Sequence, residues 1–550
     1  MMRSITSVAL FFLLVGFKDP TPVSVPKLPA VTVPKFKKDT ISIVKYGAKP
    51  DGITLNTKSI NDAINASNKT GGGVVLIPRG LWLTGPIELK SNVNLHLQRD
   101  AFLNFTSDFT QYKLIETNWE GLRAVRNQSP ISATNATNIA ITGFGIIDGS
   151  GDAWRMVKRD KLSDSQWKKL QERGGVLSDD KKIWYPSASS FEGSKIKNSF
   201  ALTPGKTVAD YENIKDFLRP NLLVLARCKN ILLEGVTFQN SAAWNLHPLM
   251  SEHITIRGVM VKNPWYGQNG DGLDLESCKN VVVENSVFDV GDDGICIKSG
   301  RDVQGRERGM PTENVLIRNS TVYHAHGGFV IGSEMSGGAR NIIVENCSFI
   351  GTDIGLRFKT TRGRGGVVEN IFIRNINMKD IPGEAILFDM YYEAKDPIVL
   401  AGERREPPKV EIKPVTAETP VFQNIYIKNV AVDGAEKAIY VRGLPEMNVK
   451  NIVMEDMVIQ AKTGLDMTEA SGIIIRNTHF ITKDKNPVMQ VHNSKGIVLD
   501  NIKYSAGAET LLAVYGEKTA AIKLLNTDAS KAKNKVEFKY GANPSVLLEK

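Results

Sequence analysis

The feature that most constrains this chain is a short apolar hexad that recurs along most of its length. Within each hexad, Ile or Val alternates with a polar residue, which is the pattern of a half-buried strand. From position 230 onward, successive hexads begin 23, 27, 34, 27, 29, 54, 27, 21 and 24 residues apart. The hexads include NILLEG from Asn230, HITIRG from His253, NVVVEN from Asn280, NVLIRN from Asn314, NIIVEN from Asn341 and NIFIRN from Asn370.

A strand repeat of this period predicts one architecture. A second short apolar alternation follows each hexad, and no helical pattern separates them. Two or three short strands every 21 to 34 residues are typical of a parallel β-helix, whose stacked coils share one core. We therefore predict an all-β protein, a single-stranded right-handed parallel β-helix. The opening Asn of most hexads indicates either a stacked Asn ladder or simple turn chemistry. The 54-residue gap is either two coils or one coil with a long insertion.

The ends and interruptions of the repeat suggest how the chain is organised. Arg3 precedes an apolar run too short to span a bilayer, so residues 1–23 are predicted to be a signal peptide and 24–40 a linker. No later apolar stretch is long enough to cross a membrane. Residues 41–550 would form the catalytic β-helix, with a helix near 57–67 capping its open N-terminal end. Two excursions from the coils, at 152–216 and 393–420, are expected to shape a cleft.

Charge and cysteine content limit the partners and cofactors. The chain has 69 Lys+Arg and 59 Asp+Glu, a net charge of +10, which fits an acidic partner without choosing among nucleic acid, an anionic surface and an acidic polysaccharide. Aromatic residues at 7% with no stacking motif argue against nucleic acid. The cysteines form no CxxC pair, so we expect buried thiols rather than a zinc site: Cys228, Cys278, Cys296 and Cys347.

The densest set of reactive residues lies in the coils that begin at 253 to 341. The strings NGDGLD, GDDGICIKSG, HAHGG and LRFKTTRGRGG follow one another there. The intervals from 271 to 292, 292 to 326 and 326 to 357 are each one coil long, and neighbouring rungs lie about 4.8 Å apart, so the groups should line up on one face. These strings supply Asp271, Asp274, Asp292, Asp293, Lys298, His324, His326, Arg357 and Lys359.

This set suits acid–base cleavage of a glycosidic bond. Adjacent carboxylates raise one another's pKa, so one can stay protonated while another is ionised. Glycoside hydrolysis needs that pairing, and Arg and Lys suit a carboxylate on the substrate. The alternative is that Asp and Gly occupy these turns only for their backbone geometry. His324 and His326 could form a metal pair, but no third ligand has clear spacing, so no metal site is predicted.

The motifs NGD, GDD, HG and R-F-K, in that order, resemble those of glycoside hydrolase family 28, the polygalacturonase family. The usual forms there are N-T-D, G/Q-D-D, G-H-G and R-I-K. The resemblance spans roughly 41–501, and HGGFVIGSEMSGG and TRGRGG look most like the bacterial, exo-acting branch. The departures are Gly270, Ala325 and Phe358, which leave open a rhamnogalacturonan or branched-pectin linkage.

The resemblance implies a pectin-lyase-like solenoid that hydrolyses α-galacturonosyl links of pectin by inversion, without a cofactor. Asp292 would be the general acid, Asp271 and Asp293 would activate water, and His326 would hold the protonation state of the acid. The expected substrate contacts are Asn269, Arg357, Lys359, Tyr392, Lys298 and His247. Inversion predicts carboxyl groups roughly 6.5 to 9.5 Å apart. We expect an exported enzyme, periplasmic or extracellular, acting on plant cell-wall polysaccharide, with the oligomeric state left open.

Two other classes of protein use the same solenoid. A polysaccharide lyase would need Ca²⁺ and a Lys or Arg base, and its unsaturated product would absorb ultraviolet light. A non-catalytic adhesin or carbohydrate binder would not need carboxylates, His, Arg and Lys in register. The excursions could block one end of the cleft, which favours exo action over endo action.

Overall fold

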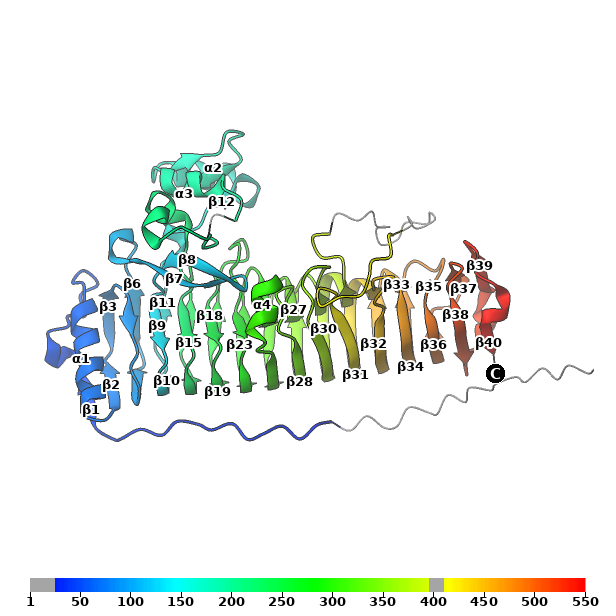
Figure 1. Cartoon of the computed structure of the whole chain (residues 1–550), viewed down its shortest axis with the longest axis horizontal. Coiled ribbons are helices and arrows are strands. Elements are labelled where there is room, and N and C mark those ends of the chain that lie inside the picture. Colours follow the sequence, from blue (N-terminus) through cyan, green and yellow to red (C-terminus); the bar gives the residue numbers. More distant parts are fainter. Residues whose placement is uncertain (1–24, 199, 395–409, 550) are drawn as a thin grey trace, which may run out of the picture.

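The computed structural model describes residues 25–198, 200–394 and 410–549. Nearly all of its strands join one 35-stranded sheet that winds as a parallel β-helix (Figure 1). The first stack of parallel strands comprises β1 (Thr40–Ser42), β2 (Gly73–Ile77), β5 (Val93–Leu97), β10 (Thr137–Gly143), β16 (Lys229–Glu234), β19 (Glu252–Arg257), β22 (Lys279–Glu284), β25 (Thr312–Arg318), β36 (Lys495–Tyr504), β38 (Ala520–Leu525) and β40 (Leu547–Glu549).

Two further stacks complete each coil. The second comprises β3 (Gly80–Thr84), β6 (Ala101–Phe105), β11 (Ile146–Asp148), β17 (Thr237–Gln239), β20 (Met260–Lys262), β23 (Val287–Asp289) and β26 (Thr321–Tyr323). The third, which we call the site sheet, comprises β4 (Ile87–Glu88), β9 (Ile131–Thr134), β15 (Leu223–Ala226), β18 (Leu246–Leu249), β21 (Leu273–Glu276), β24 (Asp293–Lys298), β27 (Gly327–Ile331), β29 (Leu356–Lys359), β33 (Thr463–Thr468), β35 (Met489–His492), β37 (Ala508–Tyr515) and β39 (Ala532–Lys539).

Five long strands run around corners from one stack to the next: β28 (Ala339–Ile350), β30 (Val367–Asp389), β31 (Val421–Arg442), β32 (Val449–Ala461) and β34 (Ala470–Thr482). The 54-residue gap falls between two of them. Strands β30 and β31 pair directly, with Ile371 opposite Ile425, so the gap is one coil with a long insertion. Residues 395–409 of that insertion lie outside the described residues.

The Asn residues that open the hexads form a ladder and also satisfy turn geometry. Asn314 donates to Asn280 at 3.1 Å and Asn341 donates to Asn314 at 3.3 Å, coil upon coil. All three have a positive φ near 55°, a left-handed conformation that Asn tolerates better than most residues. Both interpretations of this Asn are therefore correct.

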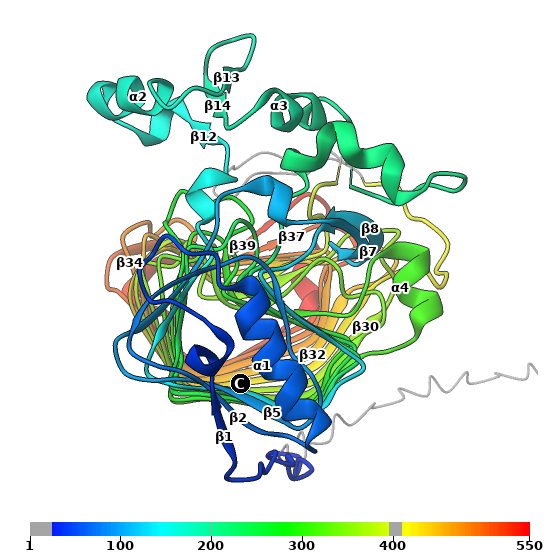
Figure 2. The ribbon, with the colours of Figure 1, turned by 90° about the vertical axis from the view of Figure 1, so that its left-hand side faces the viewer.

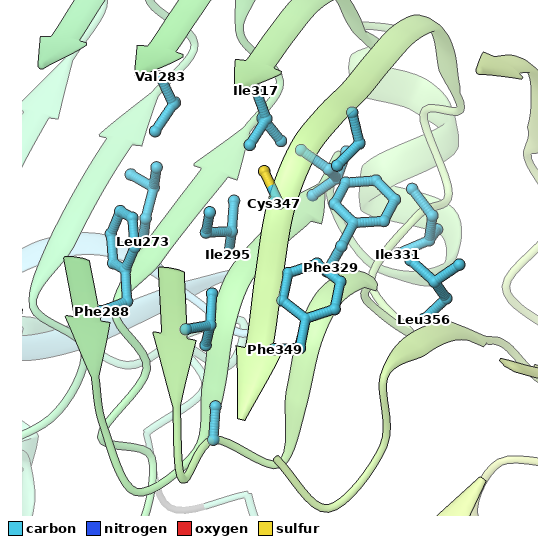
Figure 3. Packing of buried hydrophobic residues seen from close by; sticks show 14 of the residues in the cluster. Leu273, Val283, Phe288, Ile295, Ile317, Phe329, Ile331, Cys347, Phe349 and Leu356 are labelled. Atoms are coloured by element: carbon cyan, nitrogen blue, oxygen red, sulfur yellow. The ribbon is translucent and has the colours of Figure 1, made fainter. Parts of the chain in front are cut away.

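The core is a column of apolar side chains, one layer per coil. Leu273, Ile295, Phe329 and Leu356 stack on successive rungs, as Figure 3 shows, and each is fully or almost fully buried. Strands buried on the inner face in this way gain roughly 1.5 to 3 kcal/mol for each large apolar side chain removed from water. Alternating burial along each hexad thus fixes the register that positions the outward-facing groups.

The N-terminal end of the core is covered by α1 (Thr57–Lys69), as predicted. Its Ile60, Ala63 and Ile64 are buried against the first coil, and Figure 2 shows the helix lying across the open end of the solenoid. Without this cover the first rung would expose its apolar face to water. Within the described residues, no helix is long and apolar enough to cross a membrane, and the predicted signal peptide falls outside them.

Besides the insertion between β30 and β31, three insertions that contain helices or strands rise from the described coils on the side of the site sheet. One is the predicted excursion, with β12 (Val157–Lys158), β13 (Val176–Leu177), β14 (Ile183–Tyr185), α2 (Asp164–Gln171) and α3 (Ala188–Ser194) (Figures 1 and 2). The others were not predicted: an antiparallel hairpin of β7 (Leu114–Trp119) and β8 (Leu122–Asn127), and α4 (Asp302–Arg308). The four cysteines are buried free thiols, as expected.

Candidate active site

Three carboxylates meet where the chain enters the site sheet. Asp271 precedes β21, and Asp292 and Asp293 stand at the start of β24. One oxygen from each lies within 4.8 Å of the others. These nearest oxygens lie closer than the roughly 6.5 to 9.5 Å predicted between whole carboxyl groups, and that separation stays a prediction. Two hydrogen bonds of about 2.7 Å each span up to about 5.4 Å, so one water can still bridge two of the carboxylates.

The register differs from the spacing argument in detail. Leu273 pairs with Ile295, which places Asp271 opposite Asp293 rather than opposite Asp292. Asp293 pairs with Gly327, so His326 does lie beside Asp292 as expected. Val330 pairs with Arg357, so Arg357 sits further along its strand than His326 and reaches back toward Asp293. Coils of unequal length explain the difference, because loops absorb extra residues without shifting the rungs.

Asp292 is the partly exposed member of the three. Its carboxylate accepts the backbone amides of Asn269 at 3.1 Å and of Asp293 at 3.0 Å. Nδ1 of His326 lies 3.2 Å from its Oδ1, and Nε2 of the same ring lies 3.6 Å from Asp353. The hydrogen bond with Asp292 raises the pKa of His326. A proton can therefore pass between the imidazole and Asp292.

Asp293 is buried and ionised. Lys359 donates to its Oδ2 at 2.7 Å, and Nη1 of Arg357 lies 3.4 Å from its Oδ1. Burial alone would raise the pKa of this carboxyl, but Lys359 and Arg357 outweigh burial and hold the pKa below its usual range. Asp271 behaves oppositely, since burial and the neighbouring Asp274 and Asp292 raise its pKa well above the usual value. The site thus places a carboxyl that favours its protonated form beside one that favours its ionised form.

A second layer of charge lies beneath this cluster. Nζ of Lys298 lies 3.1 Å from Asp274, 3.7 Å from Asp271 and 3.8 Å from Glu334. Lys298 also lies 3.8 Å from the ring centroid of Trp244. Burial raises the pKa of Asp274 to about 6. Lys298 is almost wholly buried, so its predicted role in binding substrate stays a prediction and its observed role is to neutralise these acids.

His247 needs a correction. The residue is fully buried, so it cannot touch a sugar in this structure. Its Nε2 lies 3.0 Å from Glu276, whose other oxygen accepts Arg308 at 2.6 Å, and its ring stacks edge-on against Trp244. His247 therefore supports the floor of the site from below.

Two of the predicted contacts border the cluster. The ring of Tyr392 lies 5.1 Å from Nζ of Lys359 and 5.9 Å from the guanidinium of Arg357. Asn269 has a φ of 53°, which lets its amide face Asp292, and its side chain accepts Arg219 at 2.9 Å. By contrast, His324 is turned away, 2.9 Å from Asp289, so the two histidines do not share a ligand set.

The three motif departures are accommodated locally. Phe358 is buried and stacks on Phe388 with ring centroids 4.3 Å apart, which anchors the strand that carries Arg357 and Lys359. Ala325 is buried in the core. A side chain at Gly270 would bring its Cβ within 2.6 Å of the carbonyl of Gly267. The loop around the first motif is therefore shaped differently from one that carries Thr.

The hairpin β7–β8 closes one end of the site sheet. Trp119 near its tip stacks on Trp244 with ring centroids 4.4 Å apart, one rung before Asp271. Gly121 accepts the amide of Arg301, and Glu120 pairs with the side chain of Arg301 at 3.2 Å. Figure 1 shows the hairpin reaching across the coils to α4. The hairpin and α4 together form a wall beside the carboxylates.

Some functional neighbours were not predicted from the sequence. Glu334 lies within the motif HGGFVIGSEMSGG, and Arg219 lies just after the excursion at 152–216. Neither residue occupies a repeat position. Trp265, which is largely exposed and lies under Nζ of Lys161 at 4.6 Å, occupies the loop just before Asn269. An exposed Trp close to a catalytic motif was the only available signal, and it is weak.

A parallel β-helix that presents clustered carboxylates beside Lys and Arg has the groups expected of an enzyme that cleaves acidic polysaccharides. Comparison with known proteins makes this specific. The profile described as "Glycosyl hydrolases family 28" matches residues 209–429, and one described as "Rhamnogalacturonase A/epimerase, pectate lyase-like" matches residues 40–157.

The chain is similar to a probable polygalacturonase of Vitis vinifera, with 30% identity over 76% of this chain and 74% of the relative. It is also similar to an exo-poly-alpha-D-galacturonosidase of Dickeya chrysanthemi, with 30% identity over 80% of this chain and 70% of the relative. Among solved structures, a hyperthermoactive exopolygalacturonase of Thermotoga maritima aligns with a TM-score of 0.64 and 31% identity, over 81% of this chain and 94% of that one. The chain belongs to glycoside hydrolase family 28 and is a glycosidase of the polygalacturonase type.

Proposed function

We propose that this enzyme removes galacturonate units from one end of polygalacturonate by an inverting acid–base mechanism. The observation that carries the proposal is the set of three clustered carboxylates, in which Asp293 is held ionised by Lys359 and Arg357 while Asp271 favours its protonated form. Acid and base forms side by side are what hydrolysis of a glycosidic bond requires.

Asp292 is proposed as the general acid that protonates the leaving oxygen. It is the carboxyl most open to a substrate, and the adjacent His326 carries a proton to higher pH than an ordinary His. His326 would return a proton to Asp292 after each cleavage. Asp293, as the ionised carboxylate, would accept the proton of the attacking water, and Asp271 in its protonated form would help to orient that water. Arg357, Lys359 and Tyr392 would hold the carboxylate-bearing sugar, since charge-assisted hydrogen bonds to Arg and Lys suit that group.

The exo part of the proposal depends on the wall of hairpin β7–β8 and α4. The wall crosses the site sheet one rung before Asp271, where an open groove would otherwise continue. A polymer lying along the sheet could not pass it, so only a chain end would reach Asp292. The similarity to proteins described as exo-acting supports this reading. The enzyme is also proposed to be exported, on the strength of its N-terminal sequence.

The test is hydrolysis of polygalacturonate in the presence of a chelator, followed by reducing-end and product-size analysis. We expect galacturonate monomer as the product, and Asp292→Asn should lower kcat by about 10²- to 10⁴-fold, the usual range for a general acid. Asp289→Asn is the matched control, because that carboxyl ends β23 in the second stack and pairs with His324 outside the cluster.

Two outcomes would change the conclusion. Mixed oligomers from the start of the reaction would keep the chemistry and refute exo action. Ultraviolet-absorbing products that require Ca²⁺ would instead identify a lyase. Inversion is tested by NMR of the fresh product, which should be the β-anomer, and an initial α-anomer would contradict it.

A further inference from the structure

A cavity separate from the carboxylate cluster lies between hairpin β7–β8 and the site sheet. It has a volume of about 520 Å³, which falls within the range of small-molecule sites. Its floor is formed by residues of β9, β15 and β18, and its wall by both strands of the hairpin. None of the three catalytic carboxylates or their cations lines it. The hairpin that ends the catalytic cleft therefore also encloses this cavity.

Three buried polar atoms of the cavity's lining residues have no hydrogen-bond partner within the described part of the chain. They are Nε of Arg126, Oδ1 of Asn127 and Oδ1 of Asn221. The amide of Asn127 is fixed in orientation, because its Nδ2 donates to the carbonyls of Lys215 at 2.7 Å and Leu218 at 2.8 Å. Buried polar atoms without partners are rare and costly. One donor and two acceptors of the lining residues are thus left unsatisfied by the described chain.

Arg126 is a buried cation without a direct ion pair, since Glu120, the acid that attracts it, is in contact with Arg301 instead. Arg126 is 6% exposed, its guanidinium lies 3.5 Å from the ring centroid of Trp119, and no carboxylate of the described residues pairs with it. Burying an unpaired cation is unfavourable unless an anion joins it. The cavity therefore favours a ligand that carries a negative charge.

The rim adds to this positive field. Lys113 and Arg227 line the cavity, are exposed, and form no ion pair with the rest of the described chain. The two acids of the lining are already neutralised, because Glu88 pairs with Lys90 at 2.6 Å and Glu116 pairs with Arg123 at 3.1 Å. Three cations are left to attract an anion.

We propose that this cavity is a second, non-catalytic binding site for a uronate, a sugar that carries a carboxylate. The carboxylate would pair with Arg126 and the rim cations, and sugar hydroxyls would donate to the amide oxygens of Asn127 and Asn221. A simple anion would satisfy Arg126 but would leave both amide oxygens without donors, whereas a neutral sugar would leave the cation unpaired. The choice of galacturonate as the uronate rests on the proposed function, whereas the need for a hydroxylated anion rests on the cavity itself.

The test counts bound ligand by calorimetry on the full chain. In an Asp292→Asn background, titration with digalacturonate should give one equivalent more than in the same protein carrying Lys113→Gln and Arg227→Gln. Loss of charge-assisted hydrogen bonds should weaken binding in the cavity by at least about ten-fold. The matched control is Lys69→Gln with Arg79→Gln, two exposed cations elsewhere, which should keep the full stoichiometry.

Competition identifies the chemistry and the source of the ligand. If galacturonate monomer displaces digalacturonate from the cavity, the released product is a ligand of the site. If monomer does not displace it, the ligand is the polymer chain. Both results keep the site a uronate site and differ only in the source of the uronate. Equal stoichiometry with and without the two Gln substitutions, or displacement by inorganic phosphate or galactose alone, would overturn the proposal. Hydrolysis by the Lys113→Gln/Arg227→Gln enzyme should persist. If neither the wild type nor this variant hydrolyses polygalacturonate, the proposed function is refuted, and this result is distinct from the binding result.

Discussion

Replacing Lys359 with Met should destabilise the coils that carry the site, independently of any effect on substrate. The ammonium lies 2.7 Å from Oδ2 of Asp293, and both side chains are nearly buried. Removing one partner of a buried ion pair costs about 3 to 5 kcal/mol because the other charge is left uncompensated. Arg357 remains 3.4 Å from Asp293, so we expect a loss at the lower end, about 3 kcal/mol.

The pH dependence follows from the direction of the shift. In the wild type, the pKa of Asp293 is depressed, so its contribution to stability is present above the unfolded value of about 3.9 and is lost as pH falls through the lower folded value. In Lys359→Met, loss of the ammonium raises the pKa of Asp293 relative to wild type, because fewer cations then oppose the effect of burial. The free energy of unfolding of the variant should therefore fall furthest below that of wild type at neutral pH. The difference should become smaller as acid protonates Asp293.

Hydrogen exchange measured by mass spectrometry suits this solenoid, because coils can open separately. Lys359→Met should reduce protection in β24 and β29 at pH 7. Adding Asp293→Asn should restore much of it, because the uncompensated buried carboxylate is then gone, and Arg357, which also loses its partner, is partly exposed to water. Lys437→Met is the matched control: it breaks a pair with Asp466 at 2.9 Å in later coils and should affect β31 and β33 instead. Unchanged protection in β24, or no rescue by Asp293→Asn, would refute the reasoning.

Further predictions concern the proton relay, the wall and metal dependence. Because the hydrogen bond with Asp292 raises the pKa of His326, activity should fall as pH rises through that pKa, and the alkaline limb of the kcat/KM profile should disappear in His326→Gln; an unchanged limb would exclude the relay. Gly121 has a φ of 76° and its added Cβ would lie 2.5 Å from the amide of Arg301, so Gly121→Ala should loosen the wall and yield longer products beside monomer in chromatography; monomer alone would argue against the wall. A chelator should leave the initial rate unchanged, and a loss restored by Ca²⁺ would assign the carboxylates to a cation.

The repeat predicts the fold because each hexad carries its own burial pattern. The layered core of Leu273, Ile295 and Phe329 follows from that alternation, whereas the cap by α1 follows from the helical spacing of Ile60 and Ile64. The order of the motifs also brings Asp271, Asp292, Asp293 and His326 together. These features depend on local periodicity, which a single sequence displays.

Other features depend on how long each loop is and where it folds back. Equal spacing placed Asp271 opposite Asp292, but the loop before β24 moves it opposite Asp293. The motif around His247 does not reveal that Trp244 covers the ring, because burial depends on a hairpin more than 100 residues earlier in the chain. The hairpin and α4 carry no repeat signal, so neither the wall nor the cavity between the hairpin and the site sheet could be predicted.

The single long turn between β30 and β31 has a consequence for how such enzymes diversify. Ile371 still pairs with Ile425 although the segment that joins their strands is far longer than its counterparts. The insertion therefore does not change how the coils stack. Chain length can therefore be added to or removed from a turn without moving Asp292 relative to His326 on the neighbouring coil. In this scaffold, the coils carry the catalytic residues and the turns control which substrates reach them, so the two can change independently. Exchanging turns between relatives should therefore change the product pattern and leave the hydrolytic step intact.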